Sequence, residues 1–362
     1  MPAFGDSGRE ARDRERPLLK ERLFGKTKGE IASIVLELGR EPYTAAQLCE
    51  WLYKKRAASF EEMTNLPKEL RAQLASLFDV GALGPDRVSV SADGTKKYLF
   101  AASGRFVEAA FIPEERRATL CLSTQVGCKM GCLFCMTARQ GFQSNLTAGE
   151  IVNQYARLPE HDEITNIVYM GMGEPLDNLE PVLASLEILT ADWGFALSPE
   201  RITVSTIGII PAMIEFLARS RCHLAISLHN PFDDERRRLM PVEHVYPMAD
   251  VLAGLRASVV GRRRRVSFEY IMFDGINDTP RHAKELVRIL HGLTCRVNLI
   301  RYHSIPGSPL APSPDSRMVE FEQRLKQSGV TTTIRKSRGQ DIQAACGLLS
   351  TKALLAPEPV DY

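Results

Sequence analysis

From Arg117 to Tyr302 the sequence alternates short hydrophobic segments with amphipathic ones, and this pattern constrains the fold more than any other feature. Six segments are rich in Val, Ile and Leu and are typical of buried strands: 119–123, 164–170, 201–206, 223–228, 265–273 and 296–302. The stretches between them have helical periodicity, and the one at 147–158 opens with a capping box, Thr147-x-x-Glu150. Repeated strand–helix units with hydrophobic strands predict a parallel α/β barrel. Six units predict a partial (β/α)6 TIM-type barrel in place of the full eight.

The residues outside this pattern are of other kinds. The first residues are charged and lack an apolar period, which is typical of disorder. Further on, alternating runs are separated by Asp93-Gly94 and Ser103-Gly104, which is typical of two β-hairpins. We therefore predict five parts: a disordered arm at 1–17, a helical accessory domain with possible RNA contact at 18–80, an antiparallel β bridge at 81–116, a core barrel ending in a C-terminal segment at 117–352, and a tail at 353–362.

Composition limits the class of protein. The chain has 362 residues, of which 25% are charged and 44% hydrophobic, as in soluble globular domains. No apolar run approaches the ~18 residues of a membrane span, and the polar N-terminus is unlike a signal peptide, so we expect a cytoplasmic protein without membrane contact. The formal net charge is only +2. A nucleic-acid partner would therefore be held by local basic clusters, for which the candidates are 236–238, 262–265 and 335–338.

The chain has eight cysteines, and three of them form the motif Cys128-x3-Cys132-x2-Cys135. The motif follows the first predicted strand, where barrel enzymes place their active sites. Three thiolates so close in sequence predict a soft metal. A structural zinc site needs four ligands, and no nearby Cys or His supplies the fourth. A four-iron cluster held by three thiolates would instead leave one iron open. The other cysteines include three that fall on apolar faces and are predicted to be core residues: Cys49, Cys222 and Cys295.

With Phe134 before its last cysteine, the motif resembles that of the radical S-adenosylmethionine (SAM) superfamily. Further motifs occur in order along the chain: 117–128, Gln140-Gly-Phe142, Gly171-Met-Gly-Glu-Pro175, Ser227-Leu-His229 and 341–347. From about residue 18 to 352 the chain therefore resembles the RlmN/Cfr family of dual-specificity RNA methyltransferases. The resemblance implies a [4Fe–4S] cluster on Cys128, Cys132 and Cys135. Its open iron binds SAM, and one-electron reduction splits SAM into methionine and a 5′-deoxyadenosyl radical.

The resemblance also implies an activity, methylation of C2 of adenosine 2503 in 23S rRNA and of adenosine 37 in tRNAs. C2 is a carbon with essentially no nucleophilicity, so polar methyl transfer has no electron pair to use. In the family, Cys346 first takes a methyl group from one SAM, and the radical made from a second SAM removes hydrogen from that S-methyl group. The resulting carbon radical adds to C2. Cys121 then releases the base by forming a transient disulfide with Cys346, and Glu108 is the implied proton acceptor.

The implied SAM contacts cluster at the ends of the predicted strands: Gly173, Glu174, Ser205, Ser227, Leu228, His229 and His303. One of them departs from the family, which often has a Pro-x-Asn-Pro stretch where this chain reads Arg301-Tyr302-His303-Ser304. His303 could still donate a hydrogen bond to adenine. Two alternatives stay open, methylation of C8 of the same rRNA base, as by Cfr, and a noncatalytic RNA-binding module with zinc. A flavodoxin-type reductant and a monomeric state complete the expectations.

Overall fold

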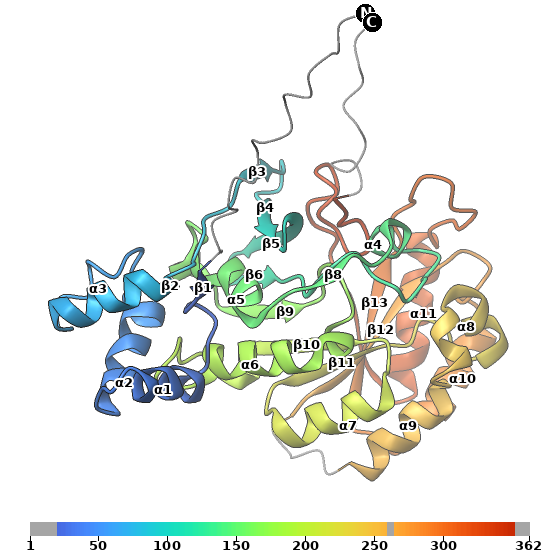
Figure 1. Ribbon diagram of the computed structural model, residues 1–362. Coiled ribbons are helices and arrows are strands. Elements are labelled where there is room, and N and C mark those ends of the chain that lie inside the picture. The colour runs from blue at the N-terminus through green and yellow to red at the C-terminus, as the bar shows by residue number, and fades with distance from the viewer. Residues whose placement is uncertain (1–19, 259–263, 352–362) are drawn as a thin grey trace, which may run out of the picture.

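The computed structural model describes residues 20–258 and 264–351 (Figure 1). The predicted arm at 1–17 and the tail at 353–362 lie outside these residues, as do Arg262 and Arg263 of one predicted basic cluster. Within the described ranges, no helix combines the length and the hydrophobicity needed to cross a membrane.

A ten-stranded sheet forms the centre of the described residues, in the order β14-β13-β12-β11-β10-β9-β6-β5-β4-β3. The strands from β6 to β14 pair in parallel. They are β6 (Arg117–Cys121), β9 (Asn166–Tyr169), β10 (Ile202–Thr206), β11 (His223–Ser227), β12 (Val266–Met272), β13 (Cys295–Arg301) and β14 (Thr331–Ile334). All six predicted strands are present, and the predicted partial barrel is confirmed.

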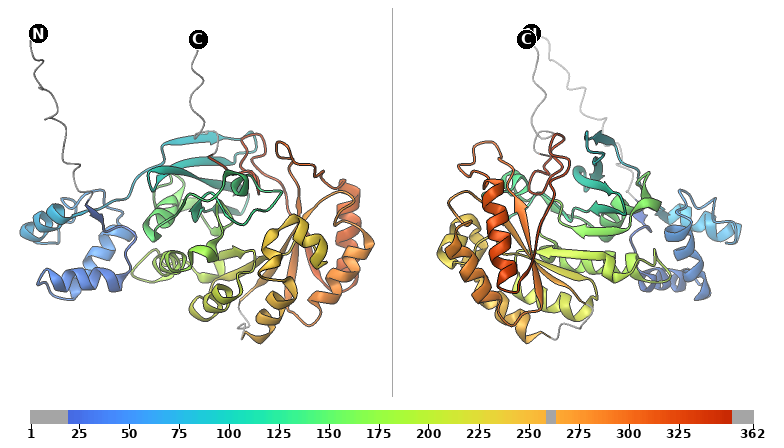
Figure 2. Two further views of the ribbon diagram at one scale, coloured as in Figure 1. Left: turned by 45° about the vertical axis from the view of Figure 1, so that its right-hand side comes forward. Right: turned by 180° about the vertical axis from the view of Figure 1, so that it is seen from behind.

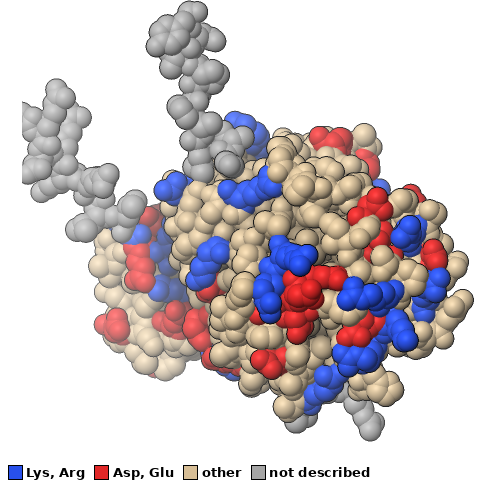
Figure 3. Space-filling model, turned by 90° about the vertical axis from the view of Figure 1, so that its right-hand side faces the viewer, with Lys and Arg blue, Asp and Glu red and all other residues tan. Residues whose placement is uncertain are grey.

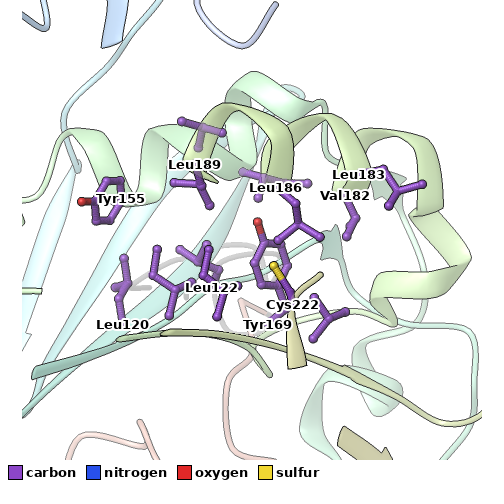
Figure 4. Packing of buried hydrophobic residues seen from close by; sticks show 14 of the residues in the cluster. Leu120, Leu122, Tyr155, Tyr169, Val182, Leu183, Leu186, Leu189 and Cys222 are labelled. Atoms are coloured by element: carbon purple, nitrogen blue, oxygen red, sulfur yellow. The ribbon is translucent and has the colours of Figure 1, made fainter. Parts of the chain in front are cut away.

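Helices cover the outer face of the curved sheet (Figures 1 and 2). The helices between the parallel strands are α5 (Ala148–Ala156), α6 (Leu179–Thr190), α7 (Ile210–Arg219), α8 (Asp233–Leu239), α9 (Met248–Ala257), α10 (Pro280–Leu290) and α11 (Asp315–Gln327). The capping box of α5 is confirmed, because Thr147 Oγ1 accepts the Glu150 N–H and the Glu150 carboxylate accepts the Thr147 N–H. The apolar stripes of these helices pack on the strands, with Leu186 and Leu189 of α6 facing Leu120 and Tyr169 (Figure 4).

The predicted hairpins are present as β3 (Arg87–Val90), β4 (Lys96–Ala102) and β5 (Arg105–Glu114). Strand β5 also pairs antiparallel with β6, and Ala110 lies opposite Cys121. The hairpins therefore extend the barrel sheet directly. Because side chains alternate along a strand, Glu108, two positions before Ala110, is on the same face of the sheet as Cys121.

The N-terminal region is helical, as predicted, and lies beside the barrel. Its elements are β1 (Glu21–Arg22), α1 (Lys28–Glu37), α2 (Tyr43–Cys49), a π-helical turn (Glu50–Lys54), α3 (Lys68–Leu77) and β2 (Phe78–Asp79). Tyr53 connects this region to the barrel, since its ring lies 5.8 Å from that of Trp193 and 5.7 Å from that of Phe195, centroid to centroid. One continuous hydrophobic core therefore includes both regions.

Candidate active site

A cavity of about 600 Å³ lies inside the barrel and reaches the carboxyl ends of the strands. All but two of the residues predicted for the site line it: Cys121, Cys128, Cys132, Cys135, Gly173, Glu174, Ser205, Ser227, His229, His303 and Cys346. The two exceptions are Glu108 and Leu228. The structure thus brings together residues from five strand ends, the cysteine loop and the C-terminal segment, where barrel enzymes carry out chemistry.

The cysteine loop follows the short strand β7 (Gln125–Val126) and ends at helix α4 (Met136–Gln140), whose N-cap is Cys135. Gly127 makes the entry to the loop possible, because it has φ +75° and a Cβ here would lie 1.7 Å from the Gly141 carbonyl oxygen. Strand β8 (Ser144–Asn145) pairs with β7 and closes the loop. The backbone therefore fixes the three cysteines on one wall of the cavity.

The three thiols fit an iron–sulfur cluster better than a single metal ion. Burial raises the pKa of Cys128 to about 12 and raises the pKa of Cys132 well above its usual value, so these thiolates need a cation to offset desolvation. In the described part of the chain, no three His, Cys, Asp or Glu side chains surround one ion position. A cubane binds each thiolate through a different iron, so it accepts ligands spaced too widely for zinc.

Glu174 presents a buried carboxylate to the cavity and is 6% exposed. Its oxygens accept hydrogen bonds from the backbone N–H groups of Leu176 (3.1 Å) and Ile207 (2.9 Å). Burial nevertheless raises the pKa of Glu174 to about 7. A cationic group bound in the cavity would favour its ionised form. Gly173 before it has φ +98°, and a Cβ here would lie 2.5 Å from the Cβ of Gln125, so the turn requires glycine.

His229 is held as a neutral hydrogen-bond donor. Its Nδ1 accepts the Ile271 N–H at 3.0 Å, which leaves the proton on Nε2. Burial and the nearby Arg236 guanidinium lower the pKa of His229 to about 3. Its ring packs edge-on against Phe134, with 5.0 Å between centroids. An imidazole in this state can bind a polar ligand but does not titrate near neutral pH.

The other predicted SAM contacts divide into two groups. Ser205 in β10 and Ser227 at the end of β11 line the cavity, as does His303, whose Nε2 is 3.0 Å from Ser337 Oγ. Leu228, in contrast, has a fully buried side chain in the hydrophobic core. Its carbonyl accepts a hydrogen bond from Arg236 Nε at 3.0 Å.

Cys121 and Cys346 belong to distant parts of the sequence but line the same cavity. Cys121 ends β6, is 8% exposed and packs against Ala344 in the C-terminal segment. Burial and the Cys346 thiol raise the pKa of Cys121 to about 12. All eight cysteines of the chain lie in the described residues and are free, so no disulfide joins this pair.

The segment that carries Cys346 is held on one side by the turn between β3 and β4. The Asp341 carboxylate accepts hydrogen bonds from Ser91 Oγ (2.5 Å) and the Ala92 N–H (3.1 Å). Asp93 accepts the Gly339 N–H at 2.9 Å. Although burial opposes it, hydrogen bonding holds the pKa of Asp93 at about 2 and that of Asp341 below its usual value. Both carboxylates are therefore ionised and bound at neutral pH.

Helix α4 holds the other side of the same segment. The Met136 N–H donates to the Gly347 carbonyl at 2.8 Å, and Thr137 Oγ1 donates to the Leu349 carbonyl at 2.7 Å. Cys346 thus lies between two anchors, one on the hairpins and one directly after the cysteine loop.

We expect Asp341→Ala to slow the RNA methylation that the family resemblance implies by about tenfold to a hundredfold, because a small displacement of a reacting group is costly. S-methylation of Cys346 and the thermal unfolding midpoint should be measured with it. Asp341→Asn keeps one acceptor oxygen and should restore part of the rate, while Asp162→Ala, which changes an exposed surface carboxylate, should be neutral. An unchanged rate for Asp341→Ala would show that this anchor is not needed.

Glu108 connects β5 to the C-terminal segment. Its carboxylate pairs with Lys97 Nζ at 2.9 Å and accepts the Ser350 N–H at 2.9 Å. The side chain is 7% exposed, and burial raises the pKa of Glu108 despite the lysine. It does not line the cavity, although it shares a face of the sheet with Cys121.

The sequence analysis missed a polar network beside the two thiols. Glu269 of β12 is 3% exposed, and its Oε1 accepts hydrogen bonds from Ser267 Oγ (3.0 Å) and Asn298 Nδ2 (2.7 Å). Its Oε2 has no hydrogen-bond partner and lies 3.7 Å from Arg335 Nε. Arg335 lines the cavity with Cys346, which is an exposed residue. Partial desolvation raises the pKa of the Cys346 thiol, and the Arg335 guanidinium acts to lower it. The signal in the sequence was the spacing of Ser267 and Glu269, which are two residues apart and therefore share the inward face of strand β12.

Two of the predicted basic clusters need correction. Arg236 is fully buried and pairs with Glu243, so it does not contact RNA phosphates; its neighbours Arg237 and Arg238 are exposed. Arg335 points into the central cavity instead of forming an outer basic patch. A run of arginines in the sequence does not show which guanidinium groups lie on the surface and which are buried or line a cavity.

A partial barrel with a three-cysteine loop and a cavity at its carboxyl end defines a radical SAM enzyme. Residues 122–287 match the family model described as the radical SAM superfamily, and residues 22–80 match that of the ribosomal RNA large subunit methyltransferase N-terminal domain. The probable dual-specificity RNA methyltransferase RlmN of Porphyromonas gingivalis is 54% identical over 330 residues, which cover 91% of this chain and 96% of that protein. The chain belongs to the RlmN family of dual-specificity RNA methyltransferases.

Two further comparisons agree. The dual-specificity RNA methyltransferase RlmN of Syntrophus aciditrophicus is 46% identical over 331 residues, covering 90% of this chain and 95% of that protein. The crystal structure of a radical SAM methyltransferase from Sphaerobacter thermophilus superposes with a TM-score of 0.84 at 41% identity, covering 91% of this chain and 99% of that one. The noncatalytic zinc module is thereby excluded.

Proposed function

We propose that this enzyme methylates C2 of adenosine 2503 in 23S rRNA and C2 of adenosine 37 in tRNAs, and uses two SAM molecules for each methyl group. The observation that carries the proposal is the meeting of Cys121 and Cys346 in the cavity that also holds the three-cysteine loop. A methyltransferase that moved the methyl group directly from SAM to RNA would need neither thiol. The proposed route needs two thiols close to the base, one to carry the methyl group and one to release the methylated base by disulfide formation.

The residues that would hold the cluster are Cys128, Cys132 and Cys135, and the bound cluster supplies the electron that cleaves SAM. Glu174 is suited to pair with the SAM ammonium group, while Ser205, Ser227 and the Nε2–H of His229 offer hydrogen bonds to its other polar groups. Leu228 would act through its backbone, and His303 is a candidate donor to adenine.

Cys346 receives the methyl group when its thiolate displaces it from SAM, with Arg335 close enough to favour the thiolate. After the methyl-derived carbon has bonded to C2, the adduct must lose one electron, for which the bound cluster would be the acceptor, and the C2 proton must leave. Glu108 is our candidate acceptor, by way of Cys121, because burial raises the pKa of this carboxyl group. Cys121 then attacks the Cys346 sulfur, and the electron pair of the broken C–S bond stays with the methylated base.

Identification of the modified nucleoside tests the proposal. RNA from reactions with wild-type protein, digested with nuclease, should contain 2-methyladenosine by mass spectrometry, and Cys346→Ala should give none. Detection of 8-methyladenosine in its place would establish the Cfr reaction and overturn the regiochemistry. Because the proposed substrates are rRNA and tRNA, we place the enzyme in the cytoplasm, with a flavodoxin-type protein as reductant and a monomer as the working form.

SAM affinity is expected to depend on pH through Glu174. With its pKa at about 7, this carboxyl group is largely neutral below pH 7, and SAM binding must then release a proton. Affinity should therefore rise by up to tenfold per pH unit towards pH 7 and level off above it. Glu174→Gln should bind more weakly than the wild type above pH 7 and without this slope, so that the two affinities converge at low pH, as measured by anaerobic calorimetry. Glu187→Gln, on α6 outside the cavity, is the matched control; a flat profile for the wild type would contradict the assignment.

A further inference from the structure

A second cavity of about 870 Å³ lies at the amino-terminal ends of the parallel strands, opposite the cysteine loop. We call it the basal pocket and define it by its cationic and imidazole side chains: Arg201, His223, Arg264, Arg265 and Arg296. All of these except Arg264 also line the central cavity, so the two cavities meet at these side chains. Arg265 precedes β12 by one residue and Arg296 is the second residue of β13. Four residues of strand, about 13 Å, separate Arg265 from Glu269 in the active site. The proposed reaction uses none of the pocket's side chains.

The basal pocket has more cationic than acidic side chains, although Glu114 and Glu269 line the central cavity that adjoins it. Glu200, which is exposed, is the only acidic residue among the described residues that line the basal pocket. Within the described ranges, the side chains of Arg265 and Arg296 have neither an ion pair nor a hydrogen bond. Two arginines elsewhere on the protein surface are paired instead, Arg288 with Glu285 at 2.5 Å and Arg324 with Glu320 at 2.7 Å. On the face seen in Figure 3, many basic side chains likewise lie beside acidic ones.

The remaining arginines of the pocket are fixed by the backbone. Arg264 donates to the Leu217 carbonyl at 2.9 Å, and Arg201 donates to the Thr165 carbonyl at 3.4 Å. Neither contact neutralises charge. Burial lowers the pKa of Arg265, and the nearby Arg296 and Arg117 guanidinium groups lower it further. Guanidinium groups thus repel one another across the pocket, and a bound anion would relieve that repulsion.

His223 adds a neutral donor to the same pocket. Its Nδ1 accepts the Arg265 N–H at 3.0 Å, so its Nε2 carries the proton. Burial and the surrounding arginines lower the pKa of His223, which keeps this tautomer at neutral pH. The pocket therefore offers hydrogen-bond donors from four strands or strand ends, with one exposed carboxylate to oppose an anion.

We propose that the basal pocket is a binding site for a compact phosphate-bearing anion of at least two phosphoryl groups. Guanidinium groups match pairs of phosphate oxygens in geometry as well as in charge. The volume exceeds what one phosphate fills and is typical of a small-molecule site. The same chemistry could be supplied by a free oligophosphate, such as a diphosphate, or by the phosphodiesters of an RNA chain.

The test is titration of the full-length protein with inorganic pyrophosphate, followed by calorimetry and thermal unfolding. Wild-type protein should bind pyrophosphate and unfold at a higher temperature in its presence. The double variant Arg265→Gln/Arg296→Gln should lose at least tenfold in affinity, because it removes the two unpaired charges. The matched control Arg288→Gln/Arg324→Gln removes two paired surface charges and should bind as wild type does.

Competition distinguishes the two sources of phosphate. If a short single-stranded RNA displaces pyrophosphate from the wild-type protein and from the control variant alike, the pocket accepts phosphodiesters. If the RNA does not compete, the ligand is a free oligophosphate. Absence of pyrophosphate binding, or equal binding by a folded double variant and the wild type, would overturn the proposal. RNA methylation by the double variant is measured separately, so failure here leaves the proposed function untouched.

Discussion

Replacing Cys121 with alanine is expected to trap a covalent adduct between the enzyme and its RNA. The alanine cannot attack the Cys346 sulfur, so the bond between the methyl-derived carbon and that sulfur persists. Multiple-turnover methylation should fall by about a thousandfold or more, as when an essential nucleophile is removed. The adduct should appear as a slowly migrating band in a denaturing gel and disappear on ribonuclease treatment.

Cys222→Ala is the matched control for this experiment. Cys222 is 1% exposed and belongs to the hydrophobic core, so its replacement changes packing without touching the cavity. It should turn over at nearly the wild-type rate and form no adduct. Normal turnover by Cys121→Ala would show that the two-thiol scheme is wrong, whereas loss of turnover without an adduct would place the role of Cys121 before formation of the RNA bond.

Replacing Cys132 with alanine is expected to abolish SAM cleavage. Only three cysteines are available on the loop, and two thiolates do not hold a four-iron cluster stably. After anaerobic reconstitution with iron and sulfide, the variant should contain little iron and should form no 5′-deoxyadenosine when reduced. RNA methylation should fall below detection for the same reason.

Cys295→Ala controls for loss of a cysteine as such, because Cys295 lies outside the central cavity. This variant should keep its iron and should form 5′-deoxyadenosine at nearly the wild-type rate. If Cys132→Ala retained the full iron content and cleaved SAM, the cluster would have to be held by other residues. The proposed ligand set would then be wrong even though the family assignment stands.

Much of the fold could be predicted because a strong hydrophobic periodicity identifies a segment of the sequence as a helix or a strand. The six predicted strands are apolar enough to be recognised without context. Strand β14 was missed because three of its four residues are threonine, and it is a strand only because it pairs with β13. Helix α11 was missed because few of its residues are apolar. Three of these apolar residues, Met318, Phe321 and Leu325, form its buried side.

The candidate site was predictable where a motif carries the chemistry and not where neighbours decide it. The cysteine spacing was sufficient to locate the loop. Nothing in the sequence places Glu269 beside Arg335, because the two residues meet through the register of three strands. Burial of Arg236 was equally hidden, since its partner Glu243 lies seven residues away in a short 3-10 helix (Pro241–His244).

The unclosed sheet has a consequence for how a substrate enters. Strands β14 and β3 form the two edges, so the barrel wall has a gap, and the segment from Arg335 to Thr351 crosses from β14 to the hairpins near β3 (Figure 2). The segment that crosses the gap between the two edge strands therefore also carries the Cys346 sulfur. If the substrate enters here, as we infer, a substitution that loosens this segment is expected to change both substrate access and the reactivity of Cys346.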